Sequence, residues 1–282
     1  MTETVSYIHH SLKEIYPPGE IRSLTRLMLE HVCGLQPYQL LADKDRALSD
    51  AQKFAINRIV ERLRQWEPVQ YILGETTFCR LTFRVSPQVL IPRPETEELV
   101  ERIVEDYAGQ TPSILDIGTG SGCIAVSLAH SLPNAKVTAL DVSAEALCIA
   151  GENAERNQVS VSFIQTDILS VEQASEAIEG MFDLIVSNPP YVRESEKACM
   201  EKNVLRYEPP LALYVTDREP LIFYRAIARL AKKKLKEGGA LYFEINARLG
   251  KETIETLQEE GYGKVTLMRD MAGKDRIIKA RR

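Results

Sequence analysis

The chain has 282 residues, which is enough for a large domain and a small one, and 44% of its residues are hydrophobic and 27% are charged. These are ordinary values for a globular protein, and they exclude a disordered or fibrous chain. The formal net charge of −5 argues against a broad nucleic-acid surface, so we expect no dedicated nucleic-acid binding.

The N-terminal part of the chain is predicted to be helical. Apolar residues recur at helical spacing through residues 5–15 and again through residues 21–32, and two prolines and a glycine at 17–19 separate these helices. Asp50 is the predicted N-cap of a third helix with a regular apolar face. Residues 1–67 are therefore expected to form a small all-α domain.

The pattern changes to strand-like alternation in residues 77–91, where apolar and polar side chains follow one another. This alternation predicts a β-hairpin with its turn at residues 86–88. Residues 68–92 are thus the expected linker between two domains. Beyond the linker, Pro94 suits the first turn of a helix that continues through Val104.

Predicted strands and helices alternate from residue 113 onward. The strands are short and apolar, which is typical of a parallel sheet with helices on both faces. The last two strands are expected to pair as an antiparallel edge. Residues 93–282 therefore predict a doubly wound, Rossmann-like α/β domain. The predicted strands are residues 113–117, 136–140, 161–165, 182–187, 240–245, 264–269 and 276–280, and helices are predicted to begin near Ser121, Ser143, Val171, Arg218 and Leu249.

A glycine-rich loop follows the first predicted strand of this domain. In an open α/β sheet, ligands bind at the carboxyl ends of the strands, so we expect a ligand here. A dinucleotide fingerprint would need its third glycine at Cys123, and no P-loop sequence occurs. The loop, with G-x-G-x-G spacing, consists of Gly118, Thr119, Gly120, Ser121 and Gly122.

Acidic residues stand at the ends of neighbouring strands. Asp141 closes the second strand, where its carboxylate can accept both hydrogens of a ribose diol, and Asp167 with Ile168 follows the third, placed to bind an adenine ring. Together with Asp116 they would repel a pyrophosphate and suit a positive sulfonium, so S-adenosylmethionine is favoured over NAD. Each feature alone also fits a tight turn or a helix cap, but their coincidence at successive strand ends favours a cofactor site.

A stiff polar loop made of Asn188, Pro189, Pro190 and Tyr191 follows the strand 182–187. The prolines fix φ and have no N–H, so the loop presents carbonyl oxygens. The Asn188 side-chain oxygen and the Pro189 carbonyl form two acceptors for one planar NH2 group, on which Tyr191 is expected to stack. Such a loop can orient a poor amide nucleophile toward a sulfonium methyl group without a dedicated base. A plain turn with a packed aromatic residue is the alternative.

Longer segments resemble the bacterial PrmC (HemK) protein-(glutamine-N5) methyltransferases. The resemblance implies a helical domain that grips class I peptide-chain release factors, a hairpin linker and a class I S-adenosylmethionine-dependent methyltransferase domain. It implies transfer to the glutamine of the Gly-Gly-Gln motif, with S-adenosylhomocysteine as product. By this resemblance, the loop 118–122, Asp141, Ile168 and Asn188 line the cofactor, and residues 188–191 line the glutamine. The segments that carry it are residues 67–74, Phe78, 89–97, 207–209, Ala212, Leu213, Asp270, Gly273 and Arg276.

A few positions depart from the family pattern. Arg80 and Asn246 stand at positions where the family usually has glycine, and Leu249 stands where it usually has glutamine. The stretch 215–220 also lacks the usual glycines. These positions lie outside the two loops, so we expect them to affect the surface that meets the partner more than the chemistry.

Two other functions stay open at this stage. A nucleic-acid N-methyltransferase is one, because adenine and guanine also offer a planar exocyclic NH2 group to such a loop. A protein that keeps the fold and has lost the reaction is the other. The acidic net charge disfavours the first, and intact loops disfavour the second.

The remaining features predict a reduced, soluble protein. Five cysteines without a CxxC pair are a poor disulfide framework, and four histidines show no metal-site spacing. No apolar run approaches the roughly 20 residues that cross a bilayer, and residues 1–20 lack a signal-peptide core. We therefore expect a cytoplasmic monomer with no metal ion and no membrane contact.

Overall fold

The computed structural model describes residues 1–35, 38–39 and 46–281, which divide into two compact units. The first unit comprises Met1–Gly74 together with Glu201–Tyr207, and it extends past residue 67, where we expected a domain boundary. The second unit comprises the rest of the chain from Glu75 onward.

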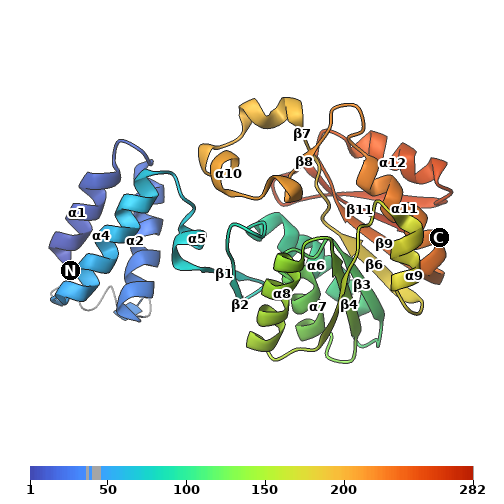
Figure 1. Ribbon diagram of the computed structural model, residues 1–282, viewed down its shortest axis with the longest axis horizontal. Coiled ribbons are helices and arrows are strands. Elements are labelled where there is room, and N and C mark those ends of the chain that lie inside the picture. The colour runs from blue at the N-terminus through green and yellow to red at the C-terminus, as the bar shows by residue number, and fades with distance from the viewer. Residues whose placement is uncertain (36–37, 40–45, 282) are drawn as a thin grey trace. The chain divides into compact units, whose positions relative to one another are not determined.

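The first unit is built of helices around an apolar core (Figure 1). Ile8, Met28 and Ile56, from three different helices, are completely buried in this core. The described helices of this unit are α1 (Thr2–Leu12), α2 (Pro18–Cys33), α4 (Asp50–Arg64), α5 (Val69–Leu73) and α10 (Lys202–Tyr207).

The N-cap of α4 is Ser49, so the prediction of Asp50 was wrong by one residue. The Ser49 hydroxyl oxygen accepts from the Gln52 backbone N–H at 3.2 Å, and the Gln52 side-chain oxygen accepts from the Ser49 N–H at 3.0 Å. This reciprocal capping box satisfies two backbone donors, whereas Asp50 takes the first helical position, where its charge favours the helix dipole.

The helix α10 joins the first unit through aromatic contacts. The Lys202 ammonium lies 4.9 Å from the centre of the Trp66 ring, which packs on the Tyr16 ring at 5.4 Å. The Tyr207 hydroxyl donates to the Gln65 carbonyl at 3.0 Å. A segment far along the chain thus belongs to the N-terminal helical unit.

The second unit is an α/β unit (Figure 1). None of the helices that the structure describes, in either unit, is both long and apolar enough to cross a membrane. The strands are β1 (Glu75–Phe78), β2 (Leu81–Arg84), β3 (Ser113–Ile117), β4 (Lys136–Asp141), β5 (Val161–Gln165), β6 (Phe182–Ser187), β7 (Val192–Arg193), β8 (Tyr214–Val215), β9 (Leu235–Glu244), β10 (Lys264–Arg269) and β11 (Asp275–Arg281). The helices are α6 (Pro94–Tyr107), α7 (Cys123–Ser131), α8 (Ala144–Arg156), α9 (Val171–Ala177), α11 (Ile222–Lys234) and α12 (Gly250–Glu259), with 3-10 turns at Glu194–Cys199 and Pro210–Ala212.

In the described residues, the main sheet has seven strands in the order β10-β11-β9-β6-β3-β4-β5. The strands β9, β6, β3, β4 and β5 run parallel, and β11 runs antiparallel between β9 and β10. This arrangement confirms the predicted Rossmann-like fold with an antiparallel C-terminal edge. The chain turns back from β3 to opposite sides of the sheet, toward β4 and toward β6, and ligands bind at such a switch point.

Helices cover both faces of this sheet (Figure 1). One apolar core joins the sheet to α9, α11 and α12, and it contains the buried aromatic residues Tyr224 and Phe243. A second core joins the other face to α6, α7 and α8. Because both faces are covered, the strands need no regular polar side, which explains why apolar residues predominate in their sequences.

The hairpin β1–β2 is present, but its turn lies at Cys79 and Arg80 and not at residues 86–88 as predicted. Both turn residues have positive φ, 47° and 64°, as two-residue hairpin turns require. Cys-Arg carries none of the Asn-Gly or Asp-Gly signal of such turns, so the sequence pattern missed it. The positive φ of Arg80 also explains why glycine suits this position in the related family.

Candidate active site

A cavity of about 290 Å³ lies in the second unit where the parallel strands end. It is walled by the segments after β3, β4, β5 and β6, and also by the start of α6. The structure therefore brings together ten of the predicted site residues: Gly118, Thr119, Gly120, Ser121, Asp141, Asp167, Ile168, Asn188, Pro189 and Pro190. Two others, Gly122 and Tyr191, are not among the residues that line the cavity.

The glycines of the loop have two different roles. Gly118 and Gly120 have φ of 72° and 54°, and a Cβ added to either would meet nothing within 4 Å. Since both line the cavity, a side chain there would occupy the space that a ligand needs. Gly122 instead begins α7, and its added Cβ would stand 3.0 Å from the Ala150 Cβ. Gly122 thus permits the close packing of α7 on α8.

Asp141 links the glycine loop to the next helix. Its carboxylate accepts from the Gly120 N–H at 2.8 Å and from the Ser143 N–H at 3.0 Å. Burial raises the pKa of Asp141, and these two backbone donors oppose that rise. Each carboxylate oxygen keeps a further lone pair, so Asp141 can still accept from the hydroxyls of a ribose.

The other two acidic residues are placed differently. Asp167 accepts from the Leu169 N–H at 2.9 Å and so shapes the turn that sets the buried Ile168 on the cavity wall. Asp116 is completely buried, and the Thr119 hydroxyl donates to it at 2.7 Å. Burial raises the pKa of Asp116 to about 7. Asp116 therefore supports the loop from within, whereas Asp141 and Asp167 meet the cavity.

The Asn-Pro-Pro-Tyr loop (residues 188–191) follows β6 directly beside β3. The Ser187 hydroxyl donates to the Ile117 carbonyl at 2.6 Å, which ties the two strand ends together. The Asn188 side-chain NH2 donates to the Thr96 hydroxyl oxygen at 3.2 Å. The Asn188 side-chain oxygen is therefore the atom of this amide that is available to accept from a ligand.

Tyr191 anchors this loop to the sheet. Its hydroxyl donates to the Glu244 carboxylate at 3.0 Å, and its ring packs against the core that contains α11. Burial raises the pKa of Tyr191 far above its usual value. The predicted stacking of this ring on an acceptor amide stays a prediction, since the ring is held in the core here.

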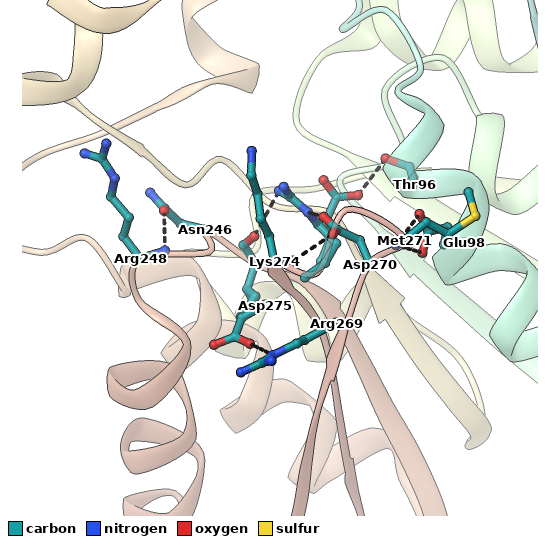
Figure 2. Close-up of polar contacts among 12 residues, drawn as sticks. Thr96, Glu98, Asn246, Arg248, Arg269, Asp270, Met271, Lys274 and Asp275 are labelled. Carbon is teal, nitrogen blue, oxygen red and sulfur yellow. Dashed lines mark hydrogen bonds and ion pairs between the residues drawn. The ribbon is translucent and has the colours of Figure 1, made fainter.

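Asn246, one of the departures from the family pattern, contacts the same loop. Its side-chain NH2 donates to the Tyr191 carbonyl at 3.1 Å and to Glu196 at 3.0 Å. Figure 2 shows its oxygen accepting from the Arg248 N–H. We expected this position to affect the surface that meets the partner. The structure places it against the end of the Asn-Pro-Pro-Tyr loop instead.

Sequence reasoning missed several residues that hold the site. Thr96 and Glu208 lie in the segments that carry the family resemblance. The residues with which their side chains form hydrogen bonds or ion pairs are distant in sequence, so the sequence did not indicate these roles. Asn153 is buried and bridges the Arg84 backbone to the Ser121 carbonyl, so it joins the hairpin to the glycine loop. Glu244 had a usable signal: like Asp141, it is a carboxylate that ends a strand directly after apolar residues.

A metal site is not apparent in the described part of the chain. No group of three or more His, Cys, Asp or Glu side chains there is arranged to hold an ion.

Solved structures share this fold. A methyltransferase from Pyrococcus furiosus has a TM-score of 0.52 at 22% identity, covering 71% of this chain and 88% of its own. A 16S rRNA N2 G1207 methyltransferase from T. Thermophilus, solved with AdoMet and guanosine, has a TM-score of 0.53 at 18% identity, covering 74% and 49%. At these identities the likeness shows the fold alone. A family model described as "Methyltransferase small domain" also matches residues 94–207. The second unit thus has the fold of known methyltransferases and contains a methyltransferase domain.

Close relatives cover the whole chain. A protein of Bacteroides thetaiotaomicron named release factor glutamine methyltransferase is 47% identical over 283 residues, covering 100% of both chains. One of the same name from Flavobacterium psychrophilum is 47% identical over 273 residues, covering 95% of this chain and 94% of its own. A family model described as "PrmC N-terminal domain" matches residues 3–74. The chain belongs to this family of release factor glutamine methyltransferases.

Proposed function

We propose that this protein transfers a methyl group from S-adenosylmethionine to the side-chain nitrogen N5 of the glutamine in the Gly-Gly-Gln motif of class I release factors, and so tunes translation termination. One observation carries the proposal: the Asn-Pro-Pro-Tyr loop and the glycine loop end adjacent strands and line a single cavity. The name of relatives that are 47% identical over almost the whole chain supports the choice of acceptor.

The cofactor is proposed to lie along the glycine loop, between Asp141 and Ile168. The residues fit it, because Gly118 and Gly120 leave the cavity open and the nearby carboxylates suit a positive ligand without phosphate groups. S-adenosylmethionine supplies an electrophilic methyl group when bound, and S-adenosylhomocysteine is the product. Asp141 would accept from the ribose hydroxyls, Asp167 would accept from the adenine amino group, and Ile168 would pack on its ring.

The glutamine amide is proposed to bind at the Asn-Pro-Pro-Tyr loop. The Asn188 side-chain oxygen and the Pro189 carbonyl would each accept one of its two N–H bonds. Accepting both bonds orients the nitrogen and favours its change from planar to pyramidal, which is worth more in the transition state than in the ground state. The surplus proton is lost to water afterwards, so no dedicated base is required.

The first unit is proposed to recognise the release factor. The family model that matches residues 3–74 supports a role common to the family. Phe54 on α4 and Tyr7 on α1 are large apolar side chains that this unit exposes. Such side chains are frequent at protein interfaces.

Transfer of a labelled methyl group tests the proposed function. Incubated with labelled S-adenosylmethionine, the protein should label a class I release factor but not a factor whose Gly-Gly-Gln glutamine is replaced by alanine. Equal labelling of both factors would contradict the proposed acceptor. Label on RNA instead, weakened steeply by salt, would indicate a nucleic-acid methyltransferase.

Asn188→Ala separates the acceptor site from the cofactor site. We expect turnover to be lost, because one of the two acceptors for the amide is removed, while calorimetry still detects S-adenosylmethionine binding. If cofactor affinity disappeared together with turnover, Asn188 would be a cofactor residue first, and the proposed role in binding glutamine would fail.

A further inference from the structure

A buried carboxylate lies behind the Asn-Pro-Pro-Tyr loop. Glu244 is the last residue of β9, and only 1% of it is exposed. Its oxygen Oε2 accepts from the Thr96 hydroxyl at 2.6 Å (Figure 2), and its oxygen Oε1 accepts from the Tyr191 hydroxyl at 3.0 Å. Both oxygens of the Glu244 carboxylate, which does not itself line the cavity, thus accept hydrogen bonds from hydroxyl groups next to the site.

These contacts fix the direction of a chain of hydrogen bonds. An ionised carboxylate can only accept, so Thr96 must spend its single hydroxyl hydrogen on Glu244. The Thr96 oxygen can then only accept, and the 3.2 Å contact with Asn188 must be donated by the Asn188 NH2 group. The Asn188 side-chain oxygen is thereby left for the cavity, as binding a substrate NH2 group requires.

We propose that Glu244 and Thr96 are positioning residues, which impose one of the two orientations of the Asn188 carboxamide and so present its oxygen to the acceptor amide of the substrate. This inference rests on the proposed function, since it needs an N–H donor as the ligand of Asn188. The two amide orientations have nearly the same shape, so packing alone does not select between them. The direction of the hydrogen bonds selects one of the two orientations.

The positive charge of Arg276 on β11 opposes the rise in the pKa of Glu244. Arg276 forms an ion pair with the buried Asp270 at 3.2 Å and donates to the Ile245 carbonyl at 3.5 Å, next to Glu244 in the chain. The cation stabilises an anion at Glu244 and so supports the acceptor-only state that the direction of hydrogen bonds requires.

Glu244→Gln gives a sharp test, because the side chain keeps its shape. With glutamine at this position, one arrangement satisfies every group: the new oxygen accepts from Tyr191, and the new NH2 donates to Thr96. Thr96 must then donate to the Asn188 oxygen, which turns the Asn188 NH2 group toward the cavity. The opposite arrangement leaves the Tyr191 hydrogen without an acceptor among these groups. Glu244→Gln is therefore expected to invert the Asn188 amide.

The expected effect of Glu244→Gln is a fall in kcat for the release factor by about 10- to 100-fold, with the melting temperature retained, because the acceptor amide is misoriented. Thr96→Val removes the hydroxyl without changing the shape and should lower kcat to a similar extent. Thr96→Ser restores the hydroxyl and should restore kcat. The double variant Thr96→Val/Glu244→Gln should be no slower than the slower single variant, because both changes act through Asn188.

The pH profile gives a second readout. Burial raises the pKa of Glu244, and the Glu95 carboxylate adds to this, whereas the Thr96 hydroxyl, the Arg276 charge and the Tyr191 hydroxyl oppose it. The ionised form is thus lost at a higher pH than for an exposed glutamate. The wild-type kcat should fall as the pH drops through that value, and the residual kcat of Glu244→Gln should lack this fall.

Three results would overturn the inference: wild-type kcat in Thr96→Val or Glu244→Gln, failure of Thr96→Ser to recover activity, or losses that multiply in the double variant. A melting temperature that falls in step with kcat would also overturn it, since that indicates a structural role. These outcomes are distinct from failure of the proposed function, in which the wild-type protein itself would not methylate the release-factor glutamine.

Discussion

Arg93 and Glu208 form an ion pair at 2.6 Å, and the Glu208 side chain is almost completely shielded from solvent. The second carboxylate oxygen of Glu208 accepts from the Ile91 N–H at 3.4 Å. Arg93 and Pro209, which follows Glu208 in the chain, both line the cavity. One carboxylate therefore fixes two segments of the cavity wall that are more than a hundred residues apart in sequence.

Glu208→Gln is expected to loosen this wall. The variant keeps its shape but loses the charge that pairs with Arg93, which should reduce the free energy of unfolding by about 1–3 kcal/mol and raise the KM for the release factor. Urea unfolding and steady-state kinetics measure the two effects. Glu194→Gln is the matched control, because its pairing with Lys197 at 3.6 Å is exposed on both sides. Equal behaviour of the two variants would contradict the role given to Glu208.

Gly120→Ala tests the placement of the cofactor. The added methyl group would enter the open side of the cavity at a φ of 54°, so S-adenosylmethionine affinity in calorimetry should fall at least about 10-fold. Gly109→Ala carries the same kind of backbone strain at φ 74°, with nothing within 4 Å, and it does not line the cavity. It should leave the affinity unchanged. Comparable losses in both variants would assign the effect to strain and remove this support for the site.

Arg80→Gly is expected to stabilise the protein. Arg80 has φ of 64° in the hairpin turn, where a residue other than glycine is strained. Removing this strain should increase the free energy of unfolding by about 1 kcal/mol. Arg80→Ala keeps the strain and should give no comparable gain. Chemical denaturation of the wild-type protein and the two variants measures this difference. Equal stabilisation of both variants would assign the gain to loss of the arginine side chain and not to relief of strain.

Asp116 should make stability depend on pH. Burial raises its pKa from 3.8 to about 7, and the nearby Asp141 charge adds to this, so the folded state holds a proton that the unfolded state has released in that range. The contribution is fully present below pH 3.8 and is lost as the pH rises through about 7. The free energy of unfolding should therefore decrease with rising pH, by up to roughly 4 kcal/mol from this group.

Asp116→Asn removes that titration but can still accept from the Thr119 hydroxyl. Its unfolding free energy should change less between acidic and neutral pH than that of the wild-type protein. Parallel pH curves for the two proteins, obtained by urea unfolding at each pH, would show that Asp116 does not titrate in this range.

The strands of the sheet could be predicted from the sequence because each strand is marked by residues that are adjacent in the chain. The predicted ranges of β3, β5 and β6 match the observed strands residue for residue, because each is a segment rich in apolar residues between turn residues. The helix α11 begins at Ile222 and not near Arg218, since Pro220 disfavours helical backbone at the residue before it. The hairpin turn at Cys79 was missed because no turn residue marks it.

The site could be predicted only in part. The glycine loop and the Asn-Pro-Pro-Tyr loop are contiguous segments at strand ends, so their spacing was visible. The bond from Thr96 to Glu244 joins residues 148 positions apart, and the roles of these two side chains depend on a register that a single sequence does not reveal. Tyr191 illustrates the same limit, because its partner Glu244 lies at the end of β9, which is distant in sequence.

In the proposed reaction, the methyl group goes to a glutamine side chain held by the Asn-Pro-Pro-Tyr loop. Fragment mass spectrometry of a release factor, after reaction with the protein and S-adenosylmethionine, tests this most directly. We expect a single added methyl group on the side-chain amide of the Gly-Gly-Gln glutamine. A methyl group on any other residue, or an unmodified factor under conditions where the cofactor binds, would contradict it.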